Sequence, residues 1–326
     1  MAEPLAAHVR PALRVILAAP RGFCAGVERA IAAVEDALTR FGAPVYVRRP
    51  IVHNRTVMRA LEAKGAVFVE ELGEVPPGAI VLLSAHGVAP AVAEEARKRA
   101  LTAYDAVCPL VAKVHREVVR HHRGGRHVLL IGHHGHPEVI GTLGQLPPGA
   151  ITLIETLEDA ARFSPRDPAR LAYVTQTTLS VDDTAAIIAV LKKRFAGIVG
   201  PHRQDICYAT TNRQDAVKRV APAVDAMIVV GSPNSSNSRR LAEVALRAGC
   251  RCAALLERAQ DLDWRCFARL RALGLTAGAS APEVLVEEIL DAFAQRYRLD
   301  VQTVTAAHEA MFFPLPRPLR SNEAAV

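Results

Sequence analysis

The chain alternates short apolar runs, many of them β-branched, with longer segments in which apolar residues recur at helical spacing. Near-continuous apolar strands between helices are typical of parallel sheets that are covered on both faces. The pattern therefore predicts an α/β fold. The runs that we predict as strands are 14–20, 45–47, 66–72, 79–85, 127–132, 151–155, 171–176, 226–231 and 275–279.

Several helix ends are marked by local sequence signals. Ser180 with Asp183, and Ser280 with Glu283, resemble capping boxes at helix N-termini. Gly249 is typical of a helix C-terminus. After Arg298 no regular element is expected, and residues 313–326 are expected to form a tail.

The length of 326 residues favours two or three subdomains. No uninterrupted apolar run is long enough for a transmembrane helix, and the first residues lack the pattern of a signal peptide. Six cysteines without a secretory signal indicate structural, metal-binding or catalytic thiols in a cytoplasmic protein. The formal net charge of +7 favours anionic partners.

Three cysteines share one local context. Cys24, Cys108 and Cys207 each follow an extended segment and precede an amphipathic helix. This repetition predicts three similar α/β modules, each of which presents a thiol at the carboxyl end of a strand. We place the first module at 26–109, the second at 110–203 and the third at 14–25 with 204–312, between an N-terminal extension at 1–13 and the C-terminal tail at 313–326.

A thiol at a helix N-terminus is expected to favour the thiolate form, which is the form that binds metals. Three such thiolates would form a tripod that leaves one coordination position open. Any single cysteine is as well explained as a small buried apolar residue, and only the shared context favours a shared site. The sequence contains no CxxC pair, which argues against a zinc ribbon. The remaining cysteines, Cys250, Cys252 and Cys266, are interpreted as structural.

Polar loops directly follow the predicted strands, with the sequences IVHN, SAHG, GHHGHPE, TQTT, GSPNSSNS and GASAP. Ligands of parallel α/β sheets bind at the carboxyl ends of strands, and His, Ser, Thr and Asn side chains can donate to phosphate oxygens. Each residue also has a structural explanation: an isolated histidine can be satisfied within the fold, and a serine can cap a helix. No Walker A or GxGxxG motif is present, so no nucleotide cofactor site is predicted.

Nine blocks in order resemble the LytB family of 4-hydroxy-3-methylbut-2-enyl diphosphate reductases: RGFCAGVERAI, IVHNRTV, SAHGV, CPLVAKVH, GHPEV, TQTTLSVDDT, DICYATTNRQDAV, NSSNSRRL and TAGASAP. The resemblance runs from about Val15 to Phe293. It implies three α/β modules in a pseudo-threefold trefoil around a central iron–sulfur cluster. Cys24, Cys108 and Cys207 match the family's ligands of one [4Fe–4S] cluster, in which one iron has no protein thiolate.

The same resemblance implies a substrate site and a reaction. Glu138 matches the residue that delivers protons. The residues that match the family's diphosphate-substrate site are His53, His86, His136, Thr177, Ser235, Ser236, Asn237 and Ser280. The implied reaction is the two-electron reductive dehydroxylation of (E)-4-hydroxy-3-methylbut-2-enyl diphosphate to isopentenyl and dimethylallyl diphosphate, the last step of the methylerythritol phosphate route.

The implied electron donor is a ferredoxin or a flavodoxin, and no membrane or nucleic-acid partner is implied. The chain departs from the family in two places. Ile140 stands where members commonly have a second acidic residue, and the shortest members have no counterpart of the extension before Val15.

Two other functions are weighed against this one. Cys and His side chains could bind zinc for hydrolysis of a phosphorylated substrate, although thiols scattered over three modules fit such a site poorly. A basic chain could also bind nucleic acid, but aromatic residues make up 5% and do not interleave with the basic residues as stacking platforms would.

Overall fold

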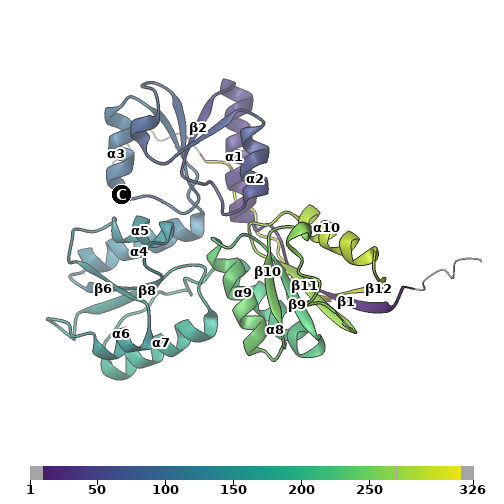
Figure 1. Cartoon of the computed structure of the whole chain (residues 1–326). Coiled ribbons are helices and arrows are strands. Elements are labelled where there is room, and N and C mark those ends of the chain that lie inside the picture. The colour runs from purple at the N-terminus through teal and green to yellow at the C-terminus, as the bar shows by residue number, and fades with distance from the viewer. Residues whose placement is uncertain (1–9, 269, 317–326) are drawn as a thin grey trace, which may run out of the picture. The chain divides into compact units, whose positions relative to one another are not determined.

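The strands form three sheets in which every described pairing is parallel (Figure 1). The computed structural model describes residues 10–268 and 270–316. The chain divides into two compact units, one formed by Met1–Phe23 with Asn212–Glu309 and the other by Cys24–Thr211 with Ala310–Val326. None of the described helices is both long enough and apolar enough to cross a membrane.

The first unit contains a five-stranded sheet in the order β10–β9–β11–β1–β12. Its strands are β1 (Ala12–Ala19), β9 (Ala226–Val230), β10 (Ala253–Leu256), β11 (Ala272–Ala277) and β12 (Arg298–Thr305). Its helices are α9 (Ser236–Arg247), α10 (Glu283–Ala294) and most of α8 (Tyr208–Val220). Short 3₁₀ helices are η2 (Ala221–Ala223) and η3 (Ala259–Asp261).

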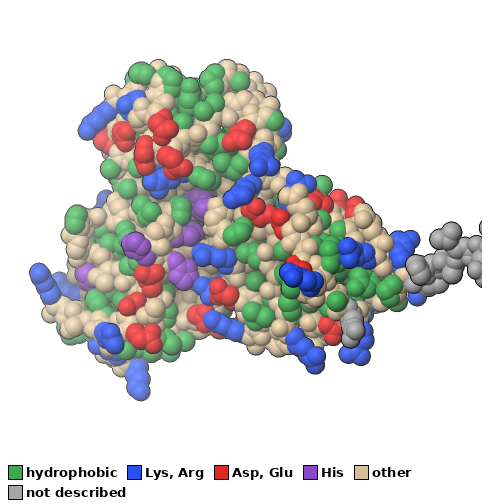
Figure 2. Space-filling model, viewed as in Figure 1, with side chains coloured by type: hydrophobic (Ala, Val, Ile, Leu, Met, Phe, Trp, Pro, Cys, Tyr) green, Lys and Arg blue, Asp and Glu red, His purple; other side chains and the backbone are tan. Residues whose placement is uncertain are grey.

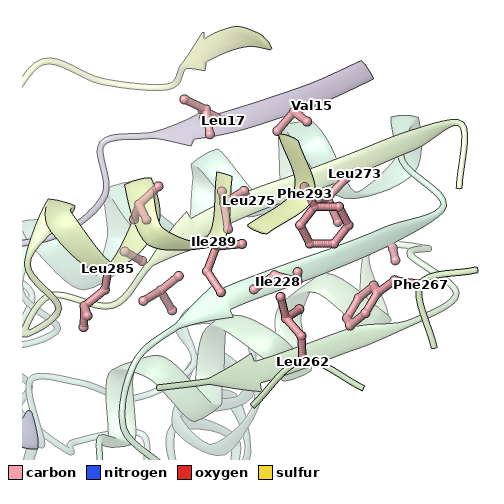
Figure 3. Close-up of a cluster of buried hydrophobic side chains, with 14 of the residues drawn as sticks. Val15, Leu17, Ile228, Leu262, Phe267, Leu273, Leu275, Leu285, Ile289 and Phe293 are labelled. Carbon is pink, nitrogen blue, oxygen red and sulfur yellow. The ribbon is translucent and has the colours of Figure 1, made fainter. Parts of the chain in front are cut away.

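Alternate residues of the strands in this sheet face opposite layers of helices. Val15 and Leu17 of β1 pack in one cluster with Ile289 and Phe293 of α10 (Figure 3). Ile16, between them, packs in another cluster with residues of α8 and α9. Both faces of the sheet are therefore buried, which explains why its central strands read as continuous apolar runs.

The second unit contains two sheets, in the orders β3–β2–β4–β5 and β7–β6–β8. The strands are β2 (Val45–Arg48), β3 (Ala66–Val69), β4 (Ile80–Leu83), β5 (Thr102–Asp105), β6 (His127–Ile131), β7 (Ile151–Ile154) and β8 (Leu171–Thr175). The helices are α1 (Ala25–Phe41), α2 (Arg55–Glu62), α3 (Pro90–Lys98), α4 (Pro109–Arg123), α5 (Pro137–Leu143), α6 (Leu157–Arg162) and α7 (Val181–Arg194), with η1 (Leu72–Glu74).

The three-stranded sheet carries helices on both faces. Val114 and Val118 of α4 pack with Val139 of α5 against Val128, Leu130 and Val174. On the opposite face, residues of α6 and α7 pack against Leu129, Ile131 and Leu171. The predicted α/β class is confirmed.

Three local expectations were wrong or incomplete. The segment after Arg298, expected to be irregular, forms β12 and pairs with β1 from Ala12↔Arg298 to Ala19↔Thr305. It is an edge strand whose side chains are mostly exposed, so it lacks the apolar signal of a buried strand. β5 was not predicted. Ser280 does not cap α10, because Pro282 occupies the N-cap position.

Other local predictions are confirmed. The Ser180 hydroxyl caps α7 by accepting a hydrogen bond from Asp183 N at 3.1 Å. Gly249, with φ +101°, follows the end of α9. The three-module boundaries stay a prediction, and most of the predicted tail, residues 317–326, lies outside the described part of the chain, as do residues 1–9 of the extension.

Candidate functional site

The three recurring cysteines lie at helix N-termini in the second unit. Cys24 is the N-cap of α1, Cys108 is the N-cap of α4, and Cys207 immediately precedes α8. The expected strand end before Cys207 is not present. The segment before this residue is irregular apart from one bridge between Ala172 and Val199.

The three thiols are close enough to influence one another electrostatically. Burial, with smaller contributions from the thiols of Cys24 and Cys207, raises the pKa of the Cys108 thiol to about 12. Burial also raises the pKa of Cys207 to about 11, with a smaller contribution from Cys24. The expectation that helix N-termini would favour the thiolate is therefore wrong for Cys108 and Cys207, because desolvation outweighs the amide hydrogen bonds that lower both values. Metal binding at these residues must displace protons.

Gly26 leaves space between two of these thiols. A Cβ atom at residue 26 would lie 2.8 Å from Cys108 Sγ and 3.8 Å from Cys24 Sγ. Within the described residues, no group of three His, Cys, Asp or Glu side chains is arranged to hold a single metal ion. The converging thiols and the side-chain-free position at Gly26 fit a group larger than one ion.

Three histidines form a second cluster in the same unit. The ring centroids of His53 and His86 are 4.3 Å apart, and the His136 ring lies 5.8 Å from the first and 5.9 Å from the second. Burial, followed by the proximity of His53 and His136, holds the pKa of His86 well below its usual value. Figure 2 shows histidine side chains gathered over the region of α4 and α5. A neutral histidine set of this kind can take up protons when an anion binds.

A buried carboxyl group lies next to the histidines in the sequence. Glu138 is 2% exposed, and both of its oxygens accept hydrogen bonds from Thr177, at 2.7 Å from the backbone N and at 2.9 Å from Oγ1. Burial, with a smaller contribution from the charge of Asp205, raises the pKa of Glu138 to about 7 although these hydrogen bonds lower it. A carboxyl group with this pKa can hold and release a proton near neutral pH.

Backbone hydrogen bonds connect the cysteines to these polar residues. Cys108 N donates to the carbonyl oxygen of Ala85, which precedes His86, at 2.9 Å. Cys207 N donates to the carbonyl oxygen of Thr177 at 3.0 Å. The thiols, the histidines and the Glu138 carboxyl group therefore belong to one connected set of residues in the second unit.

The serine and asparagine residues predicted to bind substrate lie in the first unit. Ser235 is the N-cap of α9, since its hydroxyl accepts from Ser238 N at 3.3 Å. Asn237 is 4% exposed, and neither atom of its side-chain amide has a hydrogen-bond partner among the described residues. Ser236 is the first residue of α9, and Ser280 lies in the loop after β11. Ser238 of α9 lies against the glycines that follow β9 and β11, because a Cβ at Gly231 or Gly278 would lie 2.2 or 2.0 Å from Ser238 Oγ. An unpartnered buried amide costs free energy that a bound polar ligand can recover.

Two charged residues near the cysteines were missed by the sequence analysis. Asp205, two residues before Cys207, has a fully buried side chain that pairs with Lys113 at 2.9 Å. Arg213 is also fully buried, and its guanidinium donates to the carbonyl oxygens of Gly22 at 2.8 Å and Phe23 at 3.2 Å. Both residues lie in the block DICYATTNRQDAV, which the sequence analysis interpreted only for Cys207. For Arg213, a charged residue inside the helical pattern of α8 was the available signal, whereas Asp205 lies in an irregular segment that carried none.

Comparison with known proteins identifies the family of the chain. A family model described as "LytB protein" matches residues 15–294. This chain belongs to the LytB family. Such membership implies an iron–sulfur enzyme.

Among curated relatives, "4-hydroxy-3-methylbut-2-enyl diphosphate reductase 1" of Bradyrhizobium diazoefficiens is 63% identical, over 97% of this chain and 99% of the relative. The reductase of Methylocella silvestris is 62% identical, over 96% and 98%. Among solved structures, the E-1-hydroxy-2-methyl-but-2-enyl-4-diphosphate reductase from Plasmodium falciparum matches with a TM-score of 0.87 and 38% identity, covering 94% of this chain and 96% of that one.

The space at Gly26 gives a first prediction for this LytB protein. Gly26→Ala should lower the iron and sulfide content of protein purified without oxygen, because the added Cβ would lie 2.8 Å from Cys108 Sγ. Gly73→Ala is the control, since nothing lies within 4 Å of its added Cβ. A fully loaded Gly26→Ala protein would contradict the prediction.

The buried guanidinium of Arg213 gives a second prediction. Arg213→Met should lower the free energy of unfolding of the apoprotein by about 3–5 kcal/mol, because it leaves Glu309 and two carbonyl groups without their buried partner. Urea unfolding followed by circular dichroism measures the change. Arg265→Met, which removes an exposed ion pair with Asp263, should leave the free energy of unfolding close to that of the wild-type protein. Equal effects of the two substitutions would refute the role of Arg213.

Proposed function

We propose that this chain reduces (E)-4-hydroxy-3-methylbut-2-enyl diphosphate to isopentenyl and dimethylallyl diphosphate. The reaction takes up two electrons and two protons, breaks the bond between carbon and the terminal hydroxyl oxygen, and releases that oxygen as water. The observation that carries the proposal is the link from Cys207 N through Thr177 to the buried Glu138 carboxyl, which joins a cysteine of the thiol set to a proton donor. The names of the similar reductases support the same reaction, and so does the large share of each chain that the similarity covers.

Cys24, Cys108 and Cys207 would hold one [4Fe–4S] cluster, with one iron free of protein thiolate. Two features support this assignment. The position at Gly26 is open to a group larger than an ion, and Thr210 N donates to Cys207 Sγ at 3.4 Å, which stabilises a thiolate there. The bound cluster would supply electrons one at a time and a Lewis-acidic iron.

The substrate diphosphate would be bound by two groups of side chains. His53, His86 and His136 offer ring nitrogens, and the predicted serine and asparagine set consists of Ser235, Ser236, Asn237 and Ser280. The unpartnered amide of Asn237 favours a polar ligand. An anion would raise the lowered pKa of His86 and so favour a positively charged, donating imidazole.

Glu138 would deliver protons during the reaction. Its pKa of about 7 keeps a substantial protonated fraction near neutral pH. Thr177 would orient the carboxyl through its two hydrogen bonds and help to position the reacting end of the substrate. Ile140, which replaces the second acidic residue common in the family, is 45% exposed and lies two residues from Glu138 on α5, so Glu138 is the carboxyl to which we assign proton delivery.

The electrons would come from a ferredoxin or a flavodoxin in the cytoplasm. The formal net charge of +7 would favour encounter with an acidic donor protein, which affects the association rate more than the affinity. We propose no nucleic-acid or membrane partner.

The deciding experiment is the analysis of iron, acid-labile sulfide and zinc in protein purified without oxygen. We expect nearly equal iron and sulfide, and oxidation of a reduced viologen dye that depends on the substrate. Zinc without sulfide would favour the hydrolase considered in the sequence analysis. If iron and sulfide are present but the dye is not oxidised, the assignment of the cluster stands and the proposed substrate is refuted.

A further inference from the structure

The segment that leads into Cys207 has few backbone hydrogen bonds to hold it. Between the bridge at Val199 and the start of α8 it forms no regular element. The position of Cys207 therefore depends on side chains that bind this segment, in addition to the hydrogen bond from its own N to Thr177 O.

Lys113 makes most of these contacts from α4. Its Nζ donates to the carbonyl oxygen of Arg203 at 2.6 Å and of Gln204 at 3.3 Å, and to Asp205 Oδ1 at 2.9 Å. The other carboxylate oxygen of Asp205 accepts from Thr175 N, at the end of β8, at 2.9 Å. Lys113 thus holds the irregular segment on α4, and Asp205 holds the same segment at the end of β8.

Both ends of this connection lie close to cysteines in the chain. Lys113 is little more than one helical turn from Cys108, the N-cap of α4. Asp205 is two residues before Cys207. Fixing Lys113 against Asp205 therefore restricts the separation between the Cys108 and Cys207 thiols.

The local charges make Lys113 hard to replace. Glu117, one turn further along α4, places Oε1 3.7 Å from Lys113 Nζ, and its Oε2 is buried without a hydrogen-bond partner among the described residues. The side chains of Asp205 and Glu117 are 0% and 10% exposed. One ammonium group is thus the shared cationic partner of two buried carboxylates and lowers the repulsion between them beside the segment.

We propose that Lys113 is a positioning residue for the iron–sulfur site, which sets the spacing of Cys108 and Cys207 by holding the 203–205 segment on α4. This inference rests on the proposed function only in that these cysteines bind the cluster. Residues that orient metal ligands without touching the metal act in this way in other metalloproteins.

The test compares Lys113→Met and Lys113→Arg with the wild-type protein under anaerobic conditions. The measured quantities are iron and sulfide content, the rate at which a chelator removes iron, and the thermal midpoint of the apoprotein. We expect Lys113→Met to lose iron about 10-fold to 100-fold faster than the wild type. Lys113→Arg, which keeps the charge but not the compact shape of the ammonium, should lose iron more slowly than Lys113→Met.

Lys64→Met is the matched control, because Lys64 pairs with Glu35 at 2.5 Å on an exposed surface of the same unit. It should release iron at the wild-type rate. If Lys113→Met does not fold, Asp205→Asn replaces it, since this variant removes the charge pair and keeps an acceptor for Thr175 N; accelerated iron loss from it supports the proposal and wild-type retention refutes it.

Two results would overturn the inference. One is iron release from Lys113→Met at the wild-type rate. The other is a lowered thermal midpoint of the apoprotein with unchanged iron release, which would assign Lys113 to stability alone. Wild-type protein without iron and sulfide would instead refute the proposed function, so the two failures are distinguishable.

Discussion

Replacing Glu138 by glutamine should lower the turnover of the proposed reaction by a factor of about 10² to 10⁴, the usual contribution of a positioned general acid. Glutamine keeps the size of the side chain and an oxygen that can accept from Thr177 N, so the fold should be retained. The iron and sulfide content and the cluster absorbance should therefore match those of the wild-type protein. Turnover is measured with a reduced viologen dye as electron source.

The control is Glu158→Gln, which changes an exposed carboxylate in the first turn of α6. Its turnover should equal that of the wild-type protein. Loss of the cluster from Glu138→Gln would show that Glu138 has a structural role. Full activity of this variant would remove it from the reaction.

The raised pKa of Glu138 also predicts a pH dependence. If the protonated carboxyl group is the active form, the turnover should fall as the pH rises through about 7. The same shift affects stability: between its unfolded value of 4.5 and about 7, the folded state retains a proton that the unfolded chain has lost. The contribution of Glu138 to stability should therefore decrease as the pH rises over this window. Both effects should be absent in Glu138→Gln.

Cys108→Ser should remove most of the iron and sulfide from protein purified without oxygen, and turnover with them. A serine hydroxyl is a poor substitute for a thiolate ligand of iron, and the two remaining thiols would hold the cluster from one side only. The measurement is iron and sulfide per chain, together with the visible absorbance of the cluster.

Cys266→Ser is the control for this substitution, because Cys266 is exposed and lies outside the thiol set. It should retain wild-type iron and sulfide. A Cys108→Ser protein with a full complement of iron and sulfide would contradict the assignment of the ligands. Equal losses from Cys108→Ser and Cys266→Ser would point to general oxidation of the preparation.

The sequence predicted those features that depend on residues close together in the chain, namely buried strands and helix N-termini. The continuous apolar runs at 14–20 and 226–231 predicted buried parallel strands, because strands buried on both faces need apolar residues at nearly every position. Cys24 and Cys108 were predicted at helix N-termini because each directly precedes a segment with apolar residues at helical spacing. The edge strand β12 escaped prediction because its side chains are largely exposed and carry no such signal.

The sequence by itself determined the α/β class, the helices that follow the cysteines, and the family. Only the tertiary structure decided how the site residues are connected: that Thr177 joins Cys207 to Glu138, that Lys113 holds the segment before Cys207, and that burial raises the thiol pKa values. The physical reason is that helix and strand signals arise from neighbours along the chain. Desolvation and hydrogen bonds between distant residues depend instead on what packing brings together.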